Sequence, residues 1–221
     1  MEDNIDNKMI EEARKLARKY NQAGWGSRAS VLHAVYDLFE TDIPEKMFIR
    51  LCGIIDGFQG VTSGIYEHGK SYGATMCGAL SGGIAAFGMV HGWREFPYRF
   101  WTEGMKSGGW ISDMMEDSKV TKNDKARAFI EHCKPLGYGG YYQIAARFKE
   151  HYGTTDCLDL VRPYGEYVNK DCFKNCHKII IWTAGMVAHV IMEYKINPDS
   201  LEIDERNPLL YLLEERADES I

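Results

Sequence analysis

The sequence has little of what marks a nucleic-acid-binding, membrane-spanning or exported protein. Among 221 residues, 32 acidic side chains outnumber 26 basic ones, which gives a formal net charge of -6. Nucleic-acid binding depends on clustered lysine and arginine, so this class is excluded. No apolar run approaches the ~20 residues that a bilayer span needs. The polar, acidic residues 1–7 differ from the basic and then apolar order of a secretory signal, so we expect a cytoplasmic protein with no membrane span.

Strand patterns and several catalytic fingerprints are also lacking. There is no alternating pattern bounded by hairpin turns, no Ser-His-Asp order, no phosphate-binding loop and no dinucleotide fingerprint. Apolar periodicity and capping residues instead predict helices, over residues 5–21, 27–39, 44–55, 74–90, 122–135, 141–151, 171–194 and 208–216. We therefore expect an all-α, single-domain multi-helix bundle over residues 1–221, with an aromatic insertion at 92–122 and an acidic C-terminal tail at 198–221.

Glycine is concentrated in one region of the chain. Five glycines between residues 57 and 73 predict an irregular loop, and the central helix expected over 74–90 contains Gly78, Gly82 and Gly83. Glycine inside a helix costs about 1 kcal/mol relative to alanine, so close approach by another helix or a cofactor must compensate. Such a helix, together with the aromatic residues of 92–122, suits a subunit interface, and we expect a homodimer.

Six cysteines are the main candidates for chemistry: Cys52, Cys77, Cys133, Cys157, Cys172 and Cys176. Disulfide frameworks are typical of short exported chains, so these cysteines favour metal or cluster ligation, or thiol redox chemistry. Cys52 fits simple core packing, whereas the role of Cys133 stays open.

Four of the cysteines have informative positions. Cys172 and Cys176 lie four residues apart, on one face of a helix and about one turn from each other. Cys77 and Cys157 are each expected at a helix start, where backbone N–H groups and the helix dipole lower the pKa of a thiol. Four thiolates are the number that a [2Fe–2S] centre or a tetrahedral metal site uses. The spacing alone does not show that these four cysteines converge.

His177 directly follows Cys176 and is a weaker ligand candidate, because it points partly away from the face shared by the two cysteines. Cys172, Cys176 and His177 also resemble the Cys-x-x-Cys-His motif for c-type haem attachment, with three residues between the two cysteines instead of two. This haem-binding interpretation is a minor alternative, because the usual motif has two intervening residues and belongs to exported proteins.

The stretch Cys77-Gly78-Ala79-Leu80-Ser81-Gly82-Gly83 resembles the CGAxxG motif of the redox-active protein family named for its cysteine pattern, C_GCAxxG_C_C. The segment 153–160 is similar to the third cysteine segment of that family, and Cys172 falls at the position of its final cysteine. Residues 26–32 resemble the segment of its first cysteine, where this chain has Ser27. The resemblance covers roughly residues 10–190.

The resemblance implies a redox role for Cys77, Cys157 and Cys172. The family domain also resembles part of the split-Soret cytochromes, which carry haem and an iron–sulfur centre, and this relation implies a cofactor. Two departures matter: Ser27 removes one presumed redox partner, and Cys176 adds a thiol near Cys172.

Three functional hypotheses follow. In the first, an electron carrier or oxidoreductase holds an iron–sulfur centre, most simply [2Fe–2S], through Cys77, Cys157, Cys172 and Cys176, with Gly78 and His177 as further cofactor-binding residues. The second is a metal-free thiol–disulfide oxidoreductase in which Cys77 attacks and Cys157 or Cys172 resolves. The third is a non-redox helical module that binds a small molecule against aromatic residues of 92–122. The sequence identifies no redox partner protein.

Overall fold

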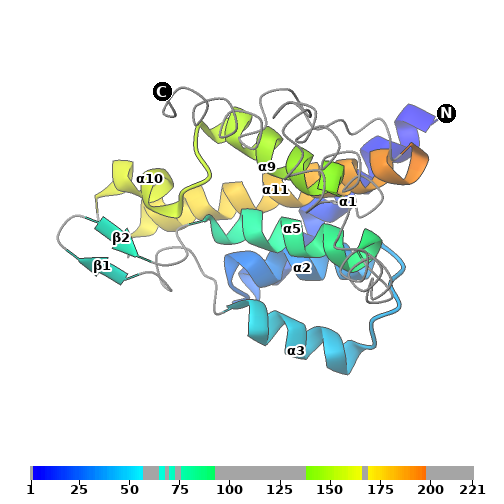
Figure 1. The fold of residues 1–221 in the computed structure, drawn as a ribbon, viewed down its shortest axis with the longest axis horizontal. Helices are drawn as coiled ribbons and strands as arrows, with labels where there is room; N and C mark the ends of the chain where they lie inside the picture. Colours follow the sequence, from blue (N-terminus) through cyan, green and yellow to red (C-terminus); the bar gives the residue numbers. More distant parts are fainter. Residues whose placement is uncertain are drawn as a thin grey trace, which may run out of the picture.

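The computed structural model describes residues 2–56, 65–67, 70–72, 76–92, 138–165 and 169–197. Within these ranges the fold is all-α, as predicted, and Figure 1 shows the arrangement of the helices. The α-helices are α1 (Glu2–Gln22), α2 (Ser27–Leu38), α3 (Glu45–Asp56), α5 (Gly78–His91), α9 (Tyr138–Tyr152), α10 (Cys157–Val161) and α11 (Lys170–Ile196), with a 3₁₀ turn, η2 (Arg162–Tyr164), after α10.

Several predicted features lie outside the described residues. These are the aromatic insertion (apart from Gly92), the helices expected over 122–135 and 208–216, the acidic tail and Cys133.

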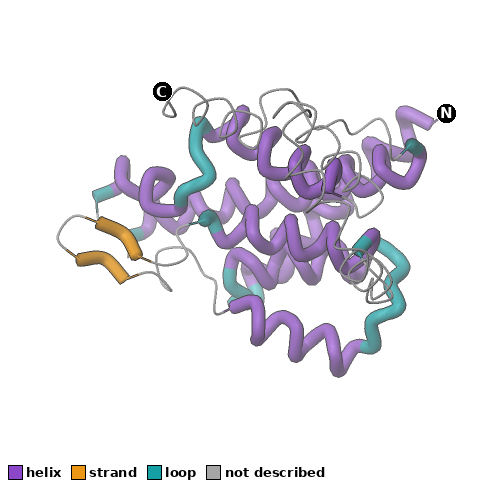
Figure 2. The backbone as a smooth tube through the Cα atoms, in the orientation of Figure 1, coloured by secondary structure: helices purple, strands orange, loops and turns teal. Residues whose placement is uncertain are grey.

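The expectation of an irregular, strand-free loop over 57–73 is wrong in one detail. Two short antiparallel strands, β1 (Ile65–Glu67) and β2 (Lys70–Tyr72), form a hairpin in which Ile65 pairs with Tyr72 and Glu67 with Lys70. Figure 2 shows this hairpin at one edge of the helical body. Each strand has three residues, which is too short to produce a recognisable alternation of apolar and polar side chains.

Local capping explains where the helices near the cysteines begin. The Asp156 side chain accepts a 2.7 Å hydrogen bond from the N–H of Leu158 and caps α10. Asn169 caps α11 by accepting hydrogen bonds from the N–H groups of Asp171 and Cys172. Ser27 is the first residue of α2, and the cap position belongs to Gly26.

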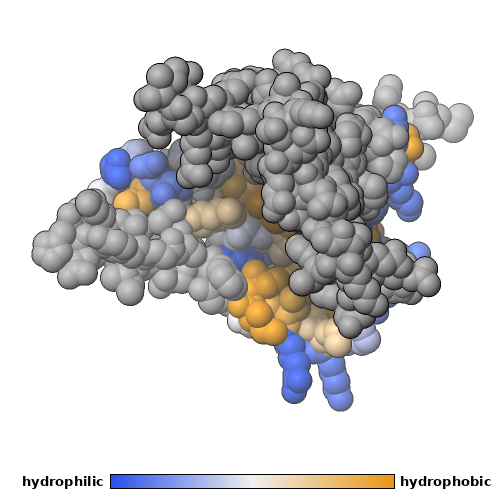
Figure 3. Space-filling view, viewed as in Figure 1, coloured by the Kyte–Doolittle hydropathy of each residue, from blue (hydrophilic) through white to orange (hydrophobic). Residues whose placement is uncertain are grey.

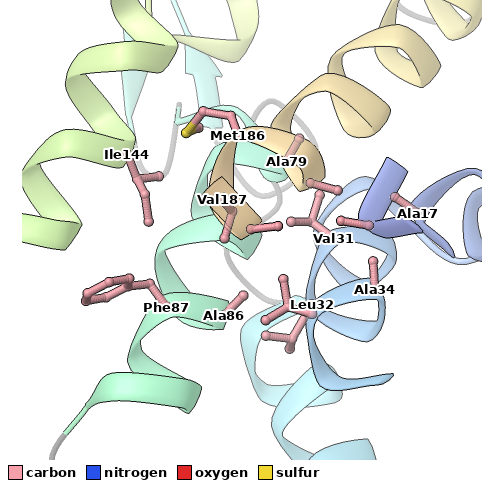
Figure 4. Close-up of a cluster of buried hydrophobic side chains, with 14 of the residues drawn as sticks. Ala17, Val31, Leu32, Ala34, Ala79, Ala86, Phe87, Ile144, Met186 and Val187 are labelled. Atoms are coloured by element: carbon pink, nitrogen blue, oxygen red, sulfur yellow. The ribbon is translucent and has the colours of Figure 1, made fainter. Parts of the chain in front are cut away.

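The core lies around α11, which packs against α1, α2, α5 and α9. Figure 4 shows apolar side chains from these helices meeting there, including Val31 and Leu32 of α2, Phe87 of α5 and Val187 of α11. The small residues of α5 permit this close packing, because a Cβ on Gly82 would lie 2.5 Å from the carbonyl oxygen of Arg28 in α2. The prediction that close helix approach compensates for the glycines of this helix is therefore confirmed.

The same packing weakens one reason for expecting a homodimer. Gly82 and Gly83 face α2 and α11, so they are not available to a second subunit. Exposed apolar side chains occur instead on α3, where Met47, Ile49 and Ile54 are at least half exposed. Figure 3 shows hydrophobic residues at the surface over this helix. The homodimer stays a prediction.

One described helix, α11, is long and apolar enough to cross a membrane by length and composition alone. The sequence analysis expected no such segment. In the most apolar stretch of α11, 61% is buried inside the protein. The central helix of a helical bundle is also long, apolar and largely buried, so it passes the same test.

Candidate redox site formed by four cysteines

The N-terminal ends of three helices meet on the left of the molecule in Figure 1. Cys77 is the N-cap residue of α5, Cys157 is the first residue of α10, and Cys172 lies in the first turn of α11. The N–H of Cys77 donates a 2.8 Å hydrogen bond to the carbonyl oxygen of Thr155, and Met76 and Asp156 form an isolated β-bridge. These backbone contacts hold the start of α5 against the start of α10.

The four thiols share a largely buried environment. The exposed fraction is 6% for Cys77, 9% for Cys157 and 1% for Cys172, and Cys176 is half-buried. Cys157 and Cys172 form a small apolar cluster with Val161, and Cys176 packs against it. None of the four forms a disulfide among the residues that the structure describes. The structure thus brings together the four cysteines that the sequence singled out, whereas Cys52 lies in the main core on α3.

Burial shifts the pKa of two of the thiols. Burial raises the pKa of Cys77 to about 11, although the backbone N–H groups of Leu80 and Ala79 oppose this shift. Burial also raises the pKa of Cys176 to about 12, and the neighbouring thiols of Cys172, Cys157 and Cys77 add to the effect. The expected lowering of the Cys77 pKa is therefore wrong, because desolvation outweighs the helix start.

A cavity of about 350 Å³ opens beside the thiols. Cys77, Cys157 and Cys176 line it, whereas Cys172 does not. The other lining residues come from the end of α1 and the loop after it, from the starts of α2 and α5, and from α11. They are Asn21, Gly24, Trp25, Gly26, Ser27, Gly78, Ala79, Phe173, His177, Ile179 and Ile180. The cavity offers room for a small group in direct contact with sulfur.

His177 lines this cavity and is held by α1. Its Nδ1 lies 2.6 Å from Oδ1 of Asn21, whose Nδ2 donates a 3.1 Å hydrogen bond to the carbonyl oxygen of Trp25. The amide orientation leaves an acceptor facing the ring, so Nδ1 donates to Asn21. No sequence signal indicated Asn21, which comes from a helix distant in the chain.

Arg28 is a second residue that the sequence analysis did not identify. It is only 1% exposed, and its Nε donates a 2.9 Å hydrogen bond to Oγ of Ser81, in the first turns of α5. Its charge acts on Cys77 and lowers the pKa of that thiol, as the smallest of the contributions. The one sequence signal for its burial was its position just before the small and apolar residues of the first turns of α2.

The four thiols interact with one another. Cys176 interacts electrostatically with Cys172, Cys157 and Cys77, and it is hydrogen-bonded to Cys172. Cys77 also interacts electrostatically with Cys157. No group of three or more histidine, cysteine, aspartate or glutamate side chains in the part of the chain that the structure describes is arranged to hold a metal ion.

Cysteines clustered at the starts of three helices thus characterise an all-α protein. Residues 30–190 match the family model described as "Putative redox-active protein (C_GCAxxG_C_C)", and the chain belongs to this family. No curated protein and no solved structure gives a significant match.

The family name also corrects the motif assignment made from the sequence. It places glycine before cysteine, as GCAxxG, whereas this chain has Cys77-Gly78-Ala79, with the two residues exchanged. The motif cysteine therefore corresponds to Gly78. A Cβ on Gly78 would overlap the hydroxyl oxygen of Ser27, the residue at the position resembling the first family cysteine. These two positions are neighbours, and in this chain neither carries a thiol.

Proposed function

We propose that this redox protein holds an iron–sulfur centre, most simply [2Fe–2S], through Cys77, Cys157, Cys172 and Cys176. The observation that carries the proposal is the gathering of four cysteines from the starts of three helices, whose thiols interact electrostatically and three of which line one cavity. When bound, such a centre supplies one-electron transfer.

The surrounding residues are suited to support bound thiolates. The backbone N–H groups of Ala79 and Leu80 act to lower the pKa of Cys77, so they favour its thiolate, and backbone N–H groups near ligand sulfur tune the potential of a cluster. Arg28 adds a buried positive charge on the same side of the site, which offsets part of the thiolate charge. Burial of the thiols limits access of water to the sulfur atoms.

The same environment argues against thiol–disulfide exchange as the main activity. The attacking species in exchange is the thiolate, and the raised pKa values keep Cys77 and Cys176 protonated near neutral pH. Cys172, at 1% exposed, is closed to a disulfide on another protein. Metal binding does not have this difficulty, because coordination itself releases the thiol proton.

Metal and sulfide analysis of the full chain, purified and reconstituted without oxygen, tests the proposal. We expect about two iron and two sulfide per chain, with absorption bands beyond about 400 nm that bleach on reduction. Serine substitution of Cys77, Cys157, Cys172 or Cys176, one at a time, should remove most of this absorption.

Cys52→Ser is the matched control, because Cys52 is also buried and without a disulfide but lies in α3, within the main core. It should bind iron as the wild-type chain does. A colourless protein without iron, whose thiols titrate fully, would reject the centre and favour the exchange mechanism. Equal iron loss in Cys52→Ser and Cys172→Ser would reject the assignment of ligands.

We further propose a reducing compartment such as the cytoplasm. None of the five cysteines in the described ranges forms a disulfide, and reducing compartments keep cysteines as thiols. Thiol counting on protein trapped by alkylation in intact cells tests this expectation.

A further inference from the structure

A second cavity, of about 540 Å³, lies between α1, α9 and α11. It shares no lining residue with the cavity at the thiols. Four basic side chains line it, Arg14, Arg147, His151 and His189, against a single carboxylate, that of Glu150. Its volume lies within the usual range for small-ligand sites, about 300–1,000 Å³.

Carboxylates that do not line the cavity hold its basic groups in place. Arg147 forms a 2.8 Å ion pair with Glu193, which also lies 3.5 Å from Nε2 of His189. Arg14 forms an ion pair with Glu11 and packs on Gly185, where a Cβ would lie 2.6 Å from its Nε. A guanidinium has five N–H donors, and these ion pairs use only part of them. The two arginines are thus positioned and retain donors for an acidic group of a ligand.

The cavity also has a flat aromatic surface. The rings of His151 and Trp182 are stacked, with centroids 4.1 Å apart and an interplanar angle of 9°. His151 is exposed, whereas Trp182 is partly buried against the core. A stacked pair of this kind provides a platform on which a planar ring of a ligand can pack.

Aromatic side chains connect this cavity with the thiols. Trp182 meets Tyr152 edge to face, with centroids 5.2 Å apart. Tyr152 ends α9 and packs against the core cluster that contains Cys77. Burial, and secondly the Cys77 thiol, raise the pKa of Tyr152, which is consistent with this proximity.

We propose that the second cavity binds a small planar aromatic anion that serves as the electron partner of the thiol site. Arg14 and Arg147 bind its acidic group, and the His151–Trp182 stack packs on its ring. The binding stands by itself, whereas the electron transfer rests on the proposed function. In that transfer the reduced iron–sulfur centre loses one electron, the oxidised ligand gains it, and no bond breaks.

Flavin mononucleotide is a suitable probe, because it combines a planar ring with a phosphate. We expect the full chain, without iron, to quench its fluorescence on binding. Riboflavin has the same ring without the phosphate and should bind at least about tenfold more weakly, since charge-assisted hydrogen bonds are lost. Inorganic phosphate should compete only at much higher concentration. Absence of quenching, or equal binding of the two flavins, overturns the proposal.

Single substitutions locate the binding site. Arg14→Gln and Arg147→Gln should each weaken flavin mononucleotide binding by about tenfold and leave riboflavin binding unchanged. His151→Ala should weaken the binding of both flavins, and His151→Phe should restore much of it. Arg162→Gln is the control, because Arg162 is an exposed arginine paired with Asp159 outside the cavity. An equal effect of Arg162→Gln overturns the assignment.

Stopped-flow mixing of the reduced, iron-loaded chain with flavin mononucleotide tests the electron transfer. We expect reduction of the flavin to be several-fold slower in Trp182→Leu than in Trp182→Phe, with the iron content equal in both. Flavin binding without reduction overturns the electron-partner role and leaves the binding site standing. If the chain binds no iron, the proposed function and this role both fail, and the binding measurements still decide the site.

Discussion

Gly82 of α5 lies so close to Arg28 of α2 that a Cβ on the glycine would come within 2.5 Å of the arginine carbonyl oxygen. This contact is with the backbone, so no side-chain rotation can relieve it. The approach places α2, and with it Arg28 and Ser27, against the first turns of α5 beside the thiols.

Substitution of Gly82 therefore tests the packing of the two helices. We expect Gly82→Ala to lower the free energy of unfolding by about 1–3 kcal/mol, as overpacking usually does. Gly53→Ala in α3 is the control, because a Cβ there meets open space, and it should raise stability by roughly 0.5–1 kcal/mol. Urea denaturation measures both. A neutral Gly82→Ala variant would show that α2 and α5 are not in this close contact.

The buried thiols predict a loss of stability at alkaline pH in the iron-free chain. The pKa of Cys77 is raised from 9.0 to about 11 and that of Cys176 to about 12, so folding favours the protonated thiols. This stabilising contribution is complete below about pH 9 and is lost as the pH rises through the folded values. Urea denaturation between pH 8 and about 11, under argon, should show a decline that is smaller in Cys77→Ala. A constant free energy of unfolding over this interval contradicts the raised values.

Arg28 predicts the direction of a shift in reduction potential. A buried positive charge stabilises the more negative, reduced state of an iron–sulfur centre, so Arg28→Met should move the midpoint potential downward. At an effective dielectric constant near 20 the shift is on the order of tens of millivolts. Arg28→Lys keeps the charge and should remain closer to the wild-type value. Redox titration of the loaded chains measures the shift, and an equal potential in Arg28→Met and wild type would remove Arg28 from the site.

The neighbouring positions 27 and 78 predict a new thiol pair. In the variant Ser27→Cys/Cys77→Gly/Gly78→Cys, the motif has the glycine-cysteine order of the family name, and both introduced thiols lie where Ser27 and Gly78 now meet. We expect diamide to link them, with a mass loss of about 2 Da.

The comparison variant carries Ser30→Cys in place of Ser27→Cys. The Ser30 hydroxyl donates to the carbonyl oxygen of Gly26, within its own helix start. This variant should not form the link, and equal oxidation of both variants would argue against the close approach of positions 27 and 78.

Much of the fold and site was predictable because the signals were local. The Asp156 cap and the four-residue spacing of Cys172 and Cys176 are properties of short segments. The meeting of Cys77 with Cys157 depends on a hydrogen bond between distant segments, and the resemblance to the family was what linked them.

The features that could not be predicted from the sequence depend on burial and on packing between helices. The pKa of Cys77 was assigned the wrong direction because a helix start is visible in a sequence and desolvation is not. Arg28 was overlooked because charged residues are seldom fully buried. The second cavity takes its residues from three helices, so no single stretch of sequence contains its pattern.

A single uninterrupted helix, α11, carries Cys176 at one cavity and Trp182 at the other. Six residues of α-helix fix their separation at about 9 Å along the axis, whatever the lengths of the surrounding loops. One residue inserted between them would rotate one cavity wall by about 100° against the other. Sequence drift in the loops therefore leaves the geometry between the two cavities unchanged, while drift in the length of this one helical segment would disrupt both together.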